Sequence, residues 1–111
     1  MAYPQRVRAE ALREAAFGTL TNTLAAIGTA TTHIGRIVKF TNNTDQDVYF
    51  SLDGVNNHFR LPSLSFVLLD CSTNGTKLDN FFIPEGQVFY VRYVTVAPAT
   101  GWVSVEYVYG G

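Results

Sequence analysis

The chain has 111 residues, of which 47% are hydrophobic, 14% aromatic and only 15% charged. A chain of this length folds as one domain, and so many aromatic residues beside so few charges exclude an intrinsically disordered protein. The eight basic and nine acidic residues give a formal net charge of −1, which argues against a general nucleic-acid binder, because such proteins concentrate Lys and Arg.

Residues 1–17 form a segment of mixed charge that differs from the rest of the chain. Its Ala residues favour a helix, and so does the spacing of Glu10 and Arg13, but Leu12 belongs to only a thin apolar stripe. We therefore predict an N-terminal arm, extended or partly helical, that becomes ordered on a neighbouring protein. The segment lacks the apolar centre of a secretory signal, and no apolar run approaches the ~20 residues of a membrane span, so we expect a soluble protein made inside the cell.

The remaining residues, 18–111, form the predicted β domain. A Thr-rich first strand is predicted over 17–27 and a second strand over 34–41. Residues 42–46 are predicted to be a turn, because Asn, Thr and Asp side chains hydrogen-bond to nearby backbone groups in turns.

The central segments also follow strand patterns. Segment 47–53 alternates most regularly, with its three large apolar residues on one face, and a short strand follows at 58–61. The run LSFVLLDC at 64–71 is apolar almost throughout, and its length favours a strand covered on both faces over a helix. An Asn-Gly pair within 72–76 predicts a tight turn.

The last two strands are predicted over 87–96 and 102–109, and both faces of each carry aromatic or branched aliphatic side chains. Only one face of a sheet packs into a sandwich core, so the other must meet a partner, the N-terminal arm or solvent. In total the pattern gives seven to eight short strands. The sequence therefore predicts an all-β fold, an antiparallel β-sandwich or jelly-roll-like barrel with an N-terminal arm.

The aromatic residues of the last strands allow three interpretations: a core, a protein interface or a flat platform for carbohydrate. Strand-borne Arg residues could pair with carboxylates across an interface or remain solvated. The candidate contact residues are Arg6, Arg8, Leu12, Arg36, Tyr49, Arg60, Tyr90, Arg92, Tyr93, Trp102, Tyr107 and Tyr109.

We expect no catalytic residue, metal ligand or cofactor, and therefore no enzyme. Cys71 is the only cysteine, which excludes an intrachain disulfide, and we expect it to be a small buried apolar residue. Asp53 and His58 could form a base with its orienting carboxylate, or two metal ligands, but one His and one carboxylate are too few for a tight site. We therefore interpret them as part of a polar loop at a strand end.

Four segments between residues 33 and 110 resemble small β-sandwich virion structural proteins of tailed bacteriophages. The longest, at 36–58, reads RIVKFTNNTDQDVYFSLDGVNNH. The others are SFVLLD at 65–70, FIPEGQVFYV at 82–91 and VSVEYVYG at 103–110.

This resemblance implies a β-sandwich subunit of a phage particle, either in a ring or collar at the head–tail junction or as a capsid decoration. Its partners would be further copies of itself, as a homo-oligomer in a ring, and other virion proteins, without a membrane or sequence-specific nucleic acid. The location would be the virion, assembled in the cytoplasm of the bacterial host. The alternative function is a small carbohydrate-binding module.

Overall fold

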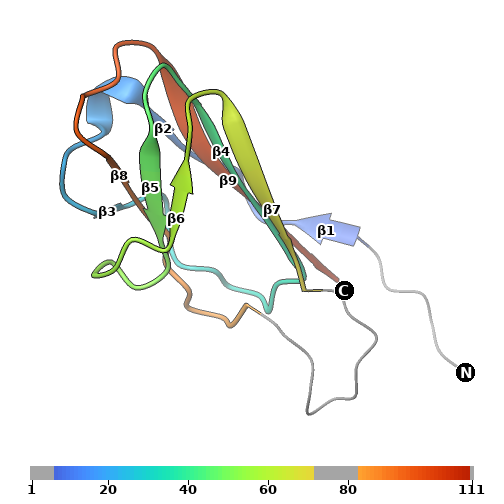
Figure 1. Ribbon diagram of the computed structural model, residues 1–111. Helices are drawn as coiled ribbons and strands as arrows, with labels where there is room; N and C mark the ends of the chain where they lie inside the picture. Colours follow the sequence, from blue (N-terminus) through green and yellow to red (C-terminus); the bar gives the residue numbers. More distant parts are fainter. Residues whose placement is uncertain (1–6, 72–82, 111) are drawn as a thin grey trace, which may run out of the picture.

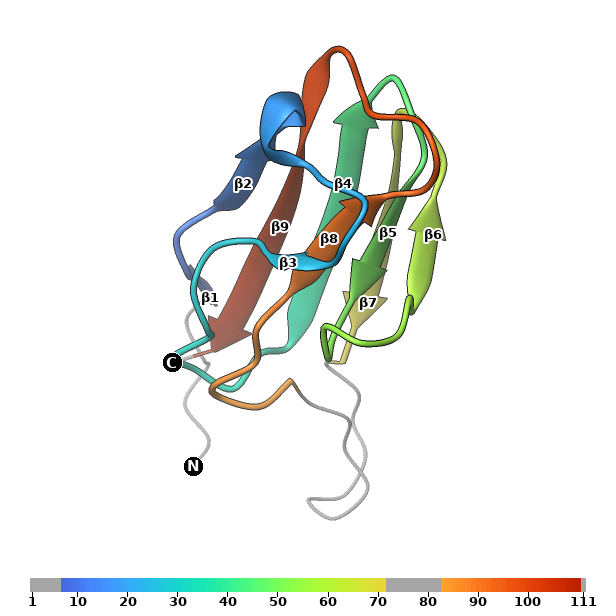
Figure 2. The same ribbon diagram turned by 90° about the vertical axis from the view of Figure 1, so that its left-hand side faces the viewer.

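Two antiparallel sheets face each other in this computed structural model, which describes residues 7–71 and 83–110 (Figures 1 and 2). One sheet has the strand order β1-β9-β4-β7, with β2 also paired to β9, and the other has the order β3-β8-β5-β6. The predicted all-β sandwich is confirmed. The strands are β1 (Val7–Ala9), β2 (Arg13–Ala16), β3 (Ala25–Ala26), β4 (Ile37–Thr44), β5 (Val48–Ser51), β6 (Phe59–Leu61), β7 (Ser65–Asp70), β8 (Tyr90–Tyr93) and β9 (Gly101–Gly110).

The hydrophobic core lies between the two sheets. Phe40 of β4 is its centre, with its ring centroid 5.0 Å from that of Phe50 on β5 and 5.6 Å from that of Phe89. Val103 and Val105 of β9 are fully buried beside them. Along β4 and β7 the more buried residues alternate with the more exposed ones, as the period of two in the sequence predicts.

Strand β9 shows which of its two apolar faces is turned inward. Tyr107 shares the inward face with Val103 and Val105 and is only 1% exposed, so it belongs to the core rather than to a contact surface. Its hydroxyl donates hydrogen bonds to the carbonyl oxygens of His33 (2.7 Å) and Ile83 (3.2 Å). These bonds satisfy the polar end of the ring and permit its burial.

The predicted N-terminal arm is extended, and in its described part it pairs within its own chain. β1 and β2 both run antiparallel to β9, with Arg13 opposite Val105. Arg13 is 5% exposed and points into the sandwich. The expectation that this segment orders only on a neighbour is therefore wrong for residues 7–16, and the helix suggested by its composition is absent there, because strand pairing and burial outweigh helix propensity.

The predicted strand over 17–27 is mostly irregular. Residues Phe17–Thr19 form one turn of 3-10 helix, and only Ala25–Ala26 pair as a strand, with β8. Leu20 and Ile27 are buried, whereas most residues between them are exposed. Leu20 and Ile27 thus fix the two ends of a loop in the core, and no continuous alternating face forms between them.

Strand β4 extends through Asn42 and Thr44, into the predicted turn. Both side chains are buried on the inward face. The Asn42 amide donates to the carbonyl oxygens of Gln46, Leu61 and Pro62, and its oxygen accepts from the Thr44 hydroxyl and amide. These turn-forming residues therefore close one end of the core with hydrogen bonds.

Two further expectations need correction. β7 is an edge strand whose residues alternate between partly buried and exposed, so it is not covered on both faces. The predicted strand over 87–96 pairs only at Tyr90–Tyr93. The predicted turn at 72–76 lies outside the described residues.

Candidate interaction surface

Residues opposite one another on paired strands share a face, so the register defines the surface of the five-stranded sheet that points away from the core. Phe66 of β7 lies opposite Thr41 of β4, which lies opposite Ser104 of β9. Leu68 lies two residues further along β7, on the same face. We call this face the outer surface. It consists of Ala9, Glu14, Ala16, Ile37, Lys39, Thr41, Asn43, Phe66, Leu68, Asp70, Trp102, Ser104, Glu106 and Val108.

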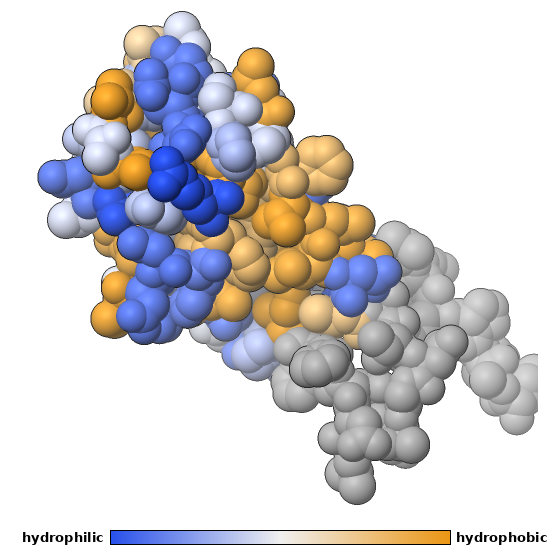
Figure 3. Space-filling view, in the orientation of Figure 1, coloured by the Kyte–Doolittle hydropathy of each residue, from blue (hydrophilic) through white to orange (hydrophobic). Residues whose placement is uncertain are grey.

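The β7 side of the outer surface is exposed and, apart from Asp70 at the end of the strand, apolar. Phe66 is 62% exposed and Leu68 is 52% exposed, and Leu64, just before the strand, is 74% exposed. Figure 3 shows hydrophobic side chains gathered on the side of the molecule where β7 lies. A run of large apolar side chains on one strand is the pattern expected of an interaction site, unlike single apolar residues scattered over a surface.

The outer surface also carries polar and charged side chains, and some of them are covered. The Lys39 ammonium lies 4.7 Å from the centroid of the Phe66 ring and directly opposite Glu106 in the register. The hydroxyls of Thr41 and Ser104 are buried and have no hydrogen-bond partner among the described residues. These two hydroxyls are therefore out of reach of solvent.

The outward face of the four-stranded sheet has a different chemistry. The ring of Tyr49 lies between two guanidinium groups, with Arg92 at 4.6 Å and Arg60 at 5.8 Å from its centroid. Arg60 also binds Asp47 at 3.0 Å, and this hydrogen bond raises the pKa of Arg60. Arg92 donates to the side chain of Asn57 and to backbone carbonyls. These side chains largely satisfy one another.

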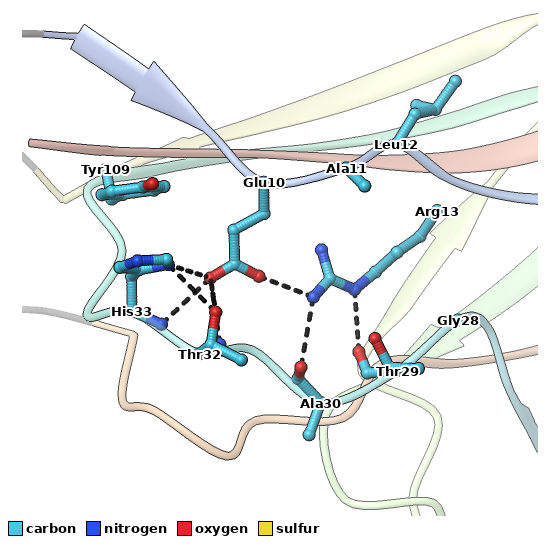
Figure 4. Close-up of a pocket in the computed structure, with 10 residues that line it drawn as sticks. All are labelled: Glu10, Ala11, Leu12, Arg13, Gly28, Thr29, Ala30, Thr32, His33 and Tyr109. Atoms are coloured by element: carbon cyan, nitrogen blue, oxygen red, sulfur yellow. Dashed lines mark hydrogen bonds and ion pairs between the residues drawn. The ribbon is translucent and has the colours of Figure 1, made fainter.

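A polar cluster fastens the N-terminal segment to the loop before β4. Figure 4 shows the Glu10 carboxylate between Arg13 on one side and Thr32 and His33 on the other. Glu10 accepts from Arg13 at 2.7 Å, and from the backbone amides of Thr32 and His33 at 3.0 Å each. Arg13 in turn donates to the Thr29 carbonyl at 2.8 Å. We call Glu10, Arg13, Thr32 and His33 the Glu10 cluster.

The electrostatics of the Glu10 cluster are those of a structural ion pair. Burial alone would raise the pKa of Glu10, but hydrogen bonds from Arg13, His33 and Thr32 outweigh it and lower the pKa to about 2. The His33 ring also stacks on Tyr109, with centroids 3.7 Å apart. A cavity of about 410 Å³ beside the cluster is lined by these groups, whose polar atoms are mostly bound to one another.

The remaining candidate contact residues are scattered. Trp102 is 37% exposed on the outer surface, whereas Tyr90 and Tyr93 belong to β8 in the other sheet. Trp102 and its neighbouring tyrosines therefore do not form one flat platform for a carbohydrate. Arg8 and Leu12 are exposed, Arg36 and Tyr109 are partly buried, and Arg6 lies outside the described residues.

Asp53 Oδ2 and His58 Nε2 lie 3.8 Å apart, but both side chains stabilise the loop between them. Asp53 accepts from the amides of Val55 and Asn56, and these hydrogen bonds lower its pKa. His58 accepts from the Leu52 amide through Nδ1. Within residues 7–71 and 83–110, no group of three or more His, Cys, Asp or Glu side chains could hold a metal ion.

Cys71 is only partly buried, and it follows directly after β7. Burial raises the pKa of its thiol, and so does the nearby charge of Asp70. A raised pKa disfavours the reactive thiolate, in keeping with a structural role for this residue.

Sequence reasoning missed Phe66 and Leu68 as contact candidates. The run that contains them is apolar on both faces, and such a run reads the same in a buried strand and in an edge strand with one exposed face. It also missed that the i,i+3 pair of Glu10 and Arg13 closes a tertiary contact. The signal was present, but it was interpreted as a helix spacing.

No family model, curated protein or solved structure matches the chain. Among the described residues, no helix has the length and apolar character to cross a membrane.

Proposed function

We propose that the protein is a structural subunit that acts by association, and that its contact surface is the outer surface with the adjoining edge strand β7. The observation that carries this proposal is the exposure of Phe66 and Leu68 on β7, and of Leu64 just before it, where β7 is an edge strand of the described sheet. At ~25 cal/mol per Å² of apolar area, leaving such side chains in water forfeits several kcal/mol that association recovers.

The resemblance of residues 33–110 to virion structural proteins supports the finer proposal that this subunit belongs to a tailed-phage particle. A virion subunit acts by repeated contact, and an apolar sheet face suits that role. Mass spectrometry of purified particles of a phage that encodes the chain tests this assignment. The protein should be a particle component, and its absence from the particles would remove the virion from the proposal.

Light scattering coupled to size-exclusion chromatography tests association itself. We expect the wild-type chain to form oligomers and a Phe66→Ser/Leu68→Ser variant to be monomeric. Val55→Ser is the matched control, because Val55 is 80% exposed but lies in the loop after β5, away from the outer surface. A wild-type chain that stays monomeric at every concentration would overturn the proposal.

A further inference from the structure

We infer that the occupant of the β7 edge is a second copy of the chain, whose own β7 pairs with it antiparallel about a two-fold axis at Val67. This inference rests on the proposed function and specifies its partner and geometry. The two five-stranded sheets would then join into one continuous sheet.

The side of β7 that points away from β4 carries backbone groups of Phe66 and Leu68 that can pair with another strand. Cys71 donates its amide to the Arg36 carbonyl at 2.6 Å, and hydrogen-bonded pairs alternate along an antiparallel ladder. The amides and carbonyls of Val67 and Leu69 therefore point toward β4, and those of Phe66 and Leu68 point away from it. No described strand lies on that side.

The other sheet edges of the described part are short, interrupted or charged. β6 has three residues with the exposed Arg60 at its centre, β3 has two residues, and the N-terminal edge breaks between β1 and β2. Such features keep edges from pairing with other molecules. β7 has six residues and no Pro, Gly, Lys or Arg among them. Among the described edge strands, β7 is therefore the long one that lacks these features.

A strand that meets its own copy across a two-fold axis is always antiparallel, and its sequence limits the register. If the two-fold axis passes through Val67, Phe66 of each copy lies opposite Leu68 of the other, and residues 65–69 of both copies pair. Centring it on Leu68 sets Phe66 opposite Asp70, so a carboxylate would be buried against a ring. Centring it on Phe66 uses only residues 65–67 of the strand.

The Val67 register also agrees with the charges and the hydrogen bonds. It places no two like charges opposite each other, because residues 65–69 are uncharged. Phe66 and Leu68 are the residues whose backbone groups face outward, so they form the hydrogen-bonded pairs, two bonds for each pair. Their side chains meet as apolar cross-strand neighbours, the arrangement that stabilises sheets.

Disulfide trapping tests this geometry in a Cys71→Ser background. At Val67 the Cα atoms of the two copies should lie about 4.5 Å apart, within the range of a disulfide. Val67→Cys should therefore form a covalent dimer on mild oxidation, seen on a non-reducing gel. Phe66→Cys or Leu68→Cys alone should not, because their self-distances are about 7–8 Å, but a mixture of these two variants should.

Two results would overturn the inference, and they have different meanings. If the wild-type chain associates by light scattering but neither Val67→Cys nor the mixture is cross-linked, the β7 pairing is wrong and the proposed function stands. If the wild-type chain is monomeric, both are wrong. The mixture keeps the test valid if Val67→Cys misfolds, because its two sites are exposed.

Discussion

At Gly101, β9 begins with a backbone φ of +93°, a conformation that L side chains rarely adopt. A Cβ atom at this position would lie 1.8 Å from the carbonyl oxygen of Asn43, which belongs to the neighbouring β4. Neither strand can shift easily, since β4 and β9 pair over eight residues from Ile37 to Thr44. Glycine is therefore required here by both conformation and space.

We predict that Gly101→Ala lowers the free energy of unfolding by more than about 2 kcal/mol, because it adds a left-handed strain to a steric clash. Gly18→Ala is the control: no atom lies within 4 Å of a Cβ placed there, and its φ lies outside the region that disfavours L side chains. We expect that change to stay within about 0.5 kcal/mol. Urea unfolding of both variants measures the difference, and equal midpoints would contradict the prediction.

The Tyr107 hydroxyl permits a second prediction at the residue scale. Tyr107→Phe leaves the ring in the core but removes the hydrogen bonds to His33 and Ile83, which should cost about 1 kcal/mol. Tyr109→Phe, in the same strand but only partly buried, should cost less. Measuring the free energy of unfolding of both variants tests this. A larger loss of stability for Tyr109→Phe would contradict this account of the core.

At the scale of elements, the N-terminal segment is held by the Glu10 cluster as well as by its pairing with β9. The pKa of Glu10 is about 2 in the folded chain, against an ordinary value of 4.5. A depressed carboxyl pKa contributes stability that is fully present above about pH 4.5 and is lost as the pH falls toward 2.

We therefore predict that Glu10→Gln weakens the pH dependence of unfolding. Between about pH 6 and about pH 3, the wild type should lose about 2 kcal/mol more stability than the variant does. Glu85→Gln, at an exposed carboxylate, should leave the wild-type pH dependence unchanged. Urea unfolding at both pH values measures the effect, and parallel curves for wild type and Glu10→Gln would show that Glu10 does not link the segment to the loop.

Elements differ in how far the sequence predicts them, for physical reasons. Val48 and Phe50 alternate with polar neighbours, so the period of two shows both the strand and its buried face. Phe66 and Leu68 alternate with Val67 and Leu69, which are apolar too, so the exposed face of β7 cannot be recognised. Whether such a strand lies inside a sheet or at its edge depends on pairing with segments far along the chain.

The same limit applies to the candidate site and to the N-terminal segment. The surplus of apolar surface could be inferred from the composition, but its position on β7 could not. Nothing local in the sequence indicates that Arg13 is buried and that its partners are backbone carbonyls at Thr29 and Ala30. Helix propensity was the local signal available, and tertiary contacts override it.

At the scale of the whole molecule, the proposed dimer links folding stability to protein concentration. A chain that associates only when folded is stabilised by mass action, so its Tm rises with concentration. Leu68→Lys places a charge on the exposed face of the edge strand, a change that natural proteins use to prevent edge pairing. Leu68 is half exposed, so the monomer itself should keep its fold.

We predict that the self-affinity of Leu68→Lys falls at least about tenfold, so that tenfold dilution lowers the Tm of the wild type more than that of the variant. Val55→Lys adds the same charge in an exposed loop and should retain the wild-type concentration dependence. Calorimetry over a range of concentrations, with light scattering on the same samples, measures both quantities. A Tm that rises equally with concentration in wild type and Leu68→Lys would show that the chain associates through a surface other than β7.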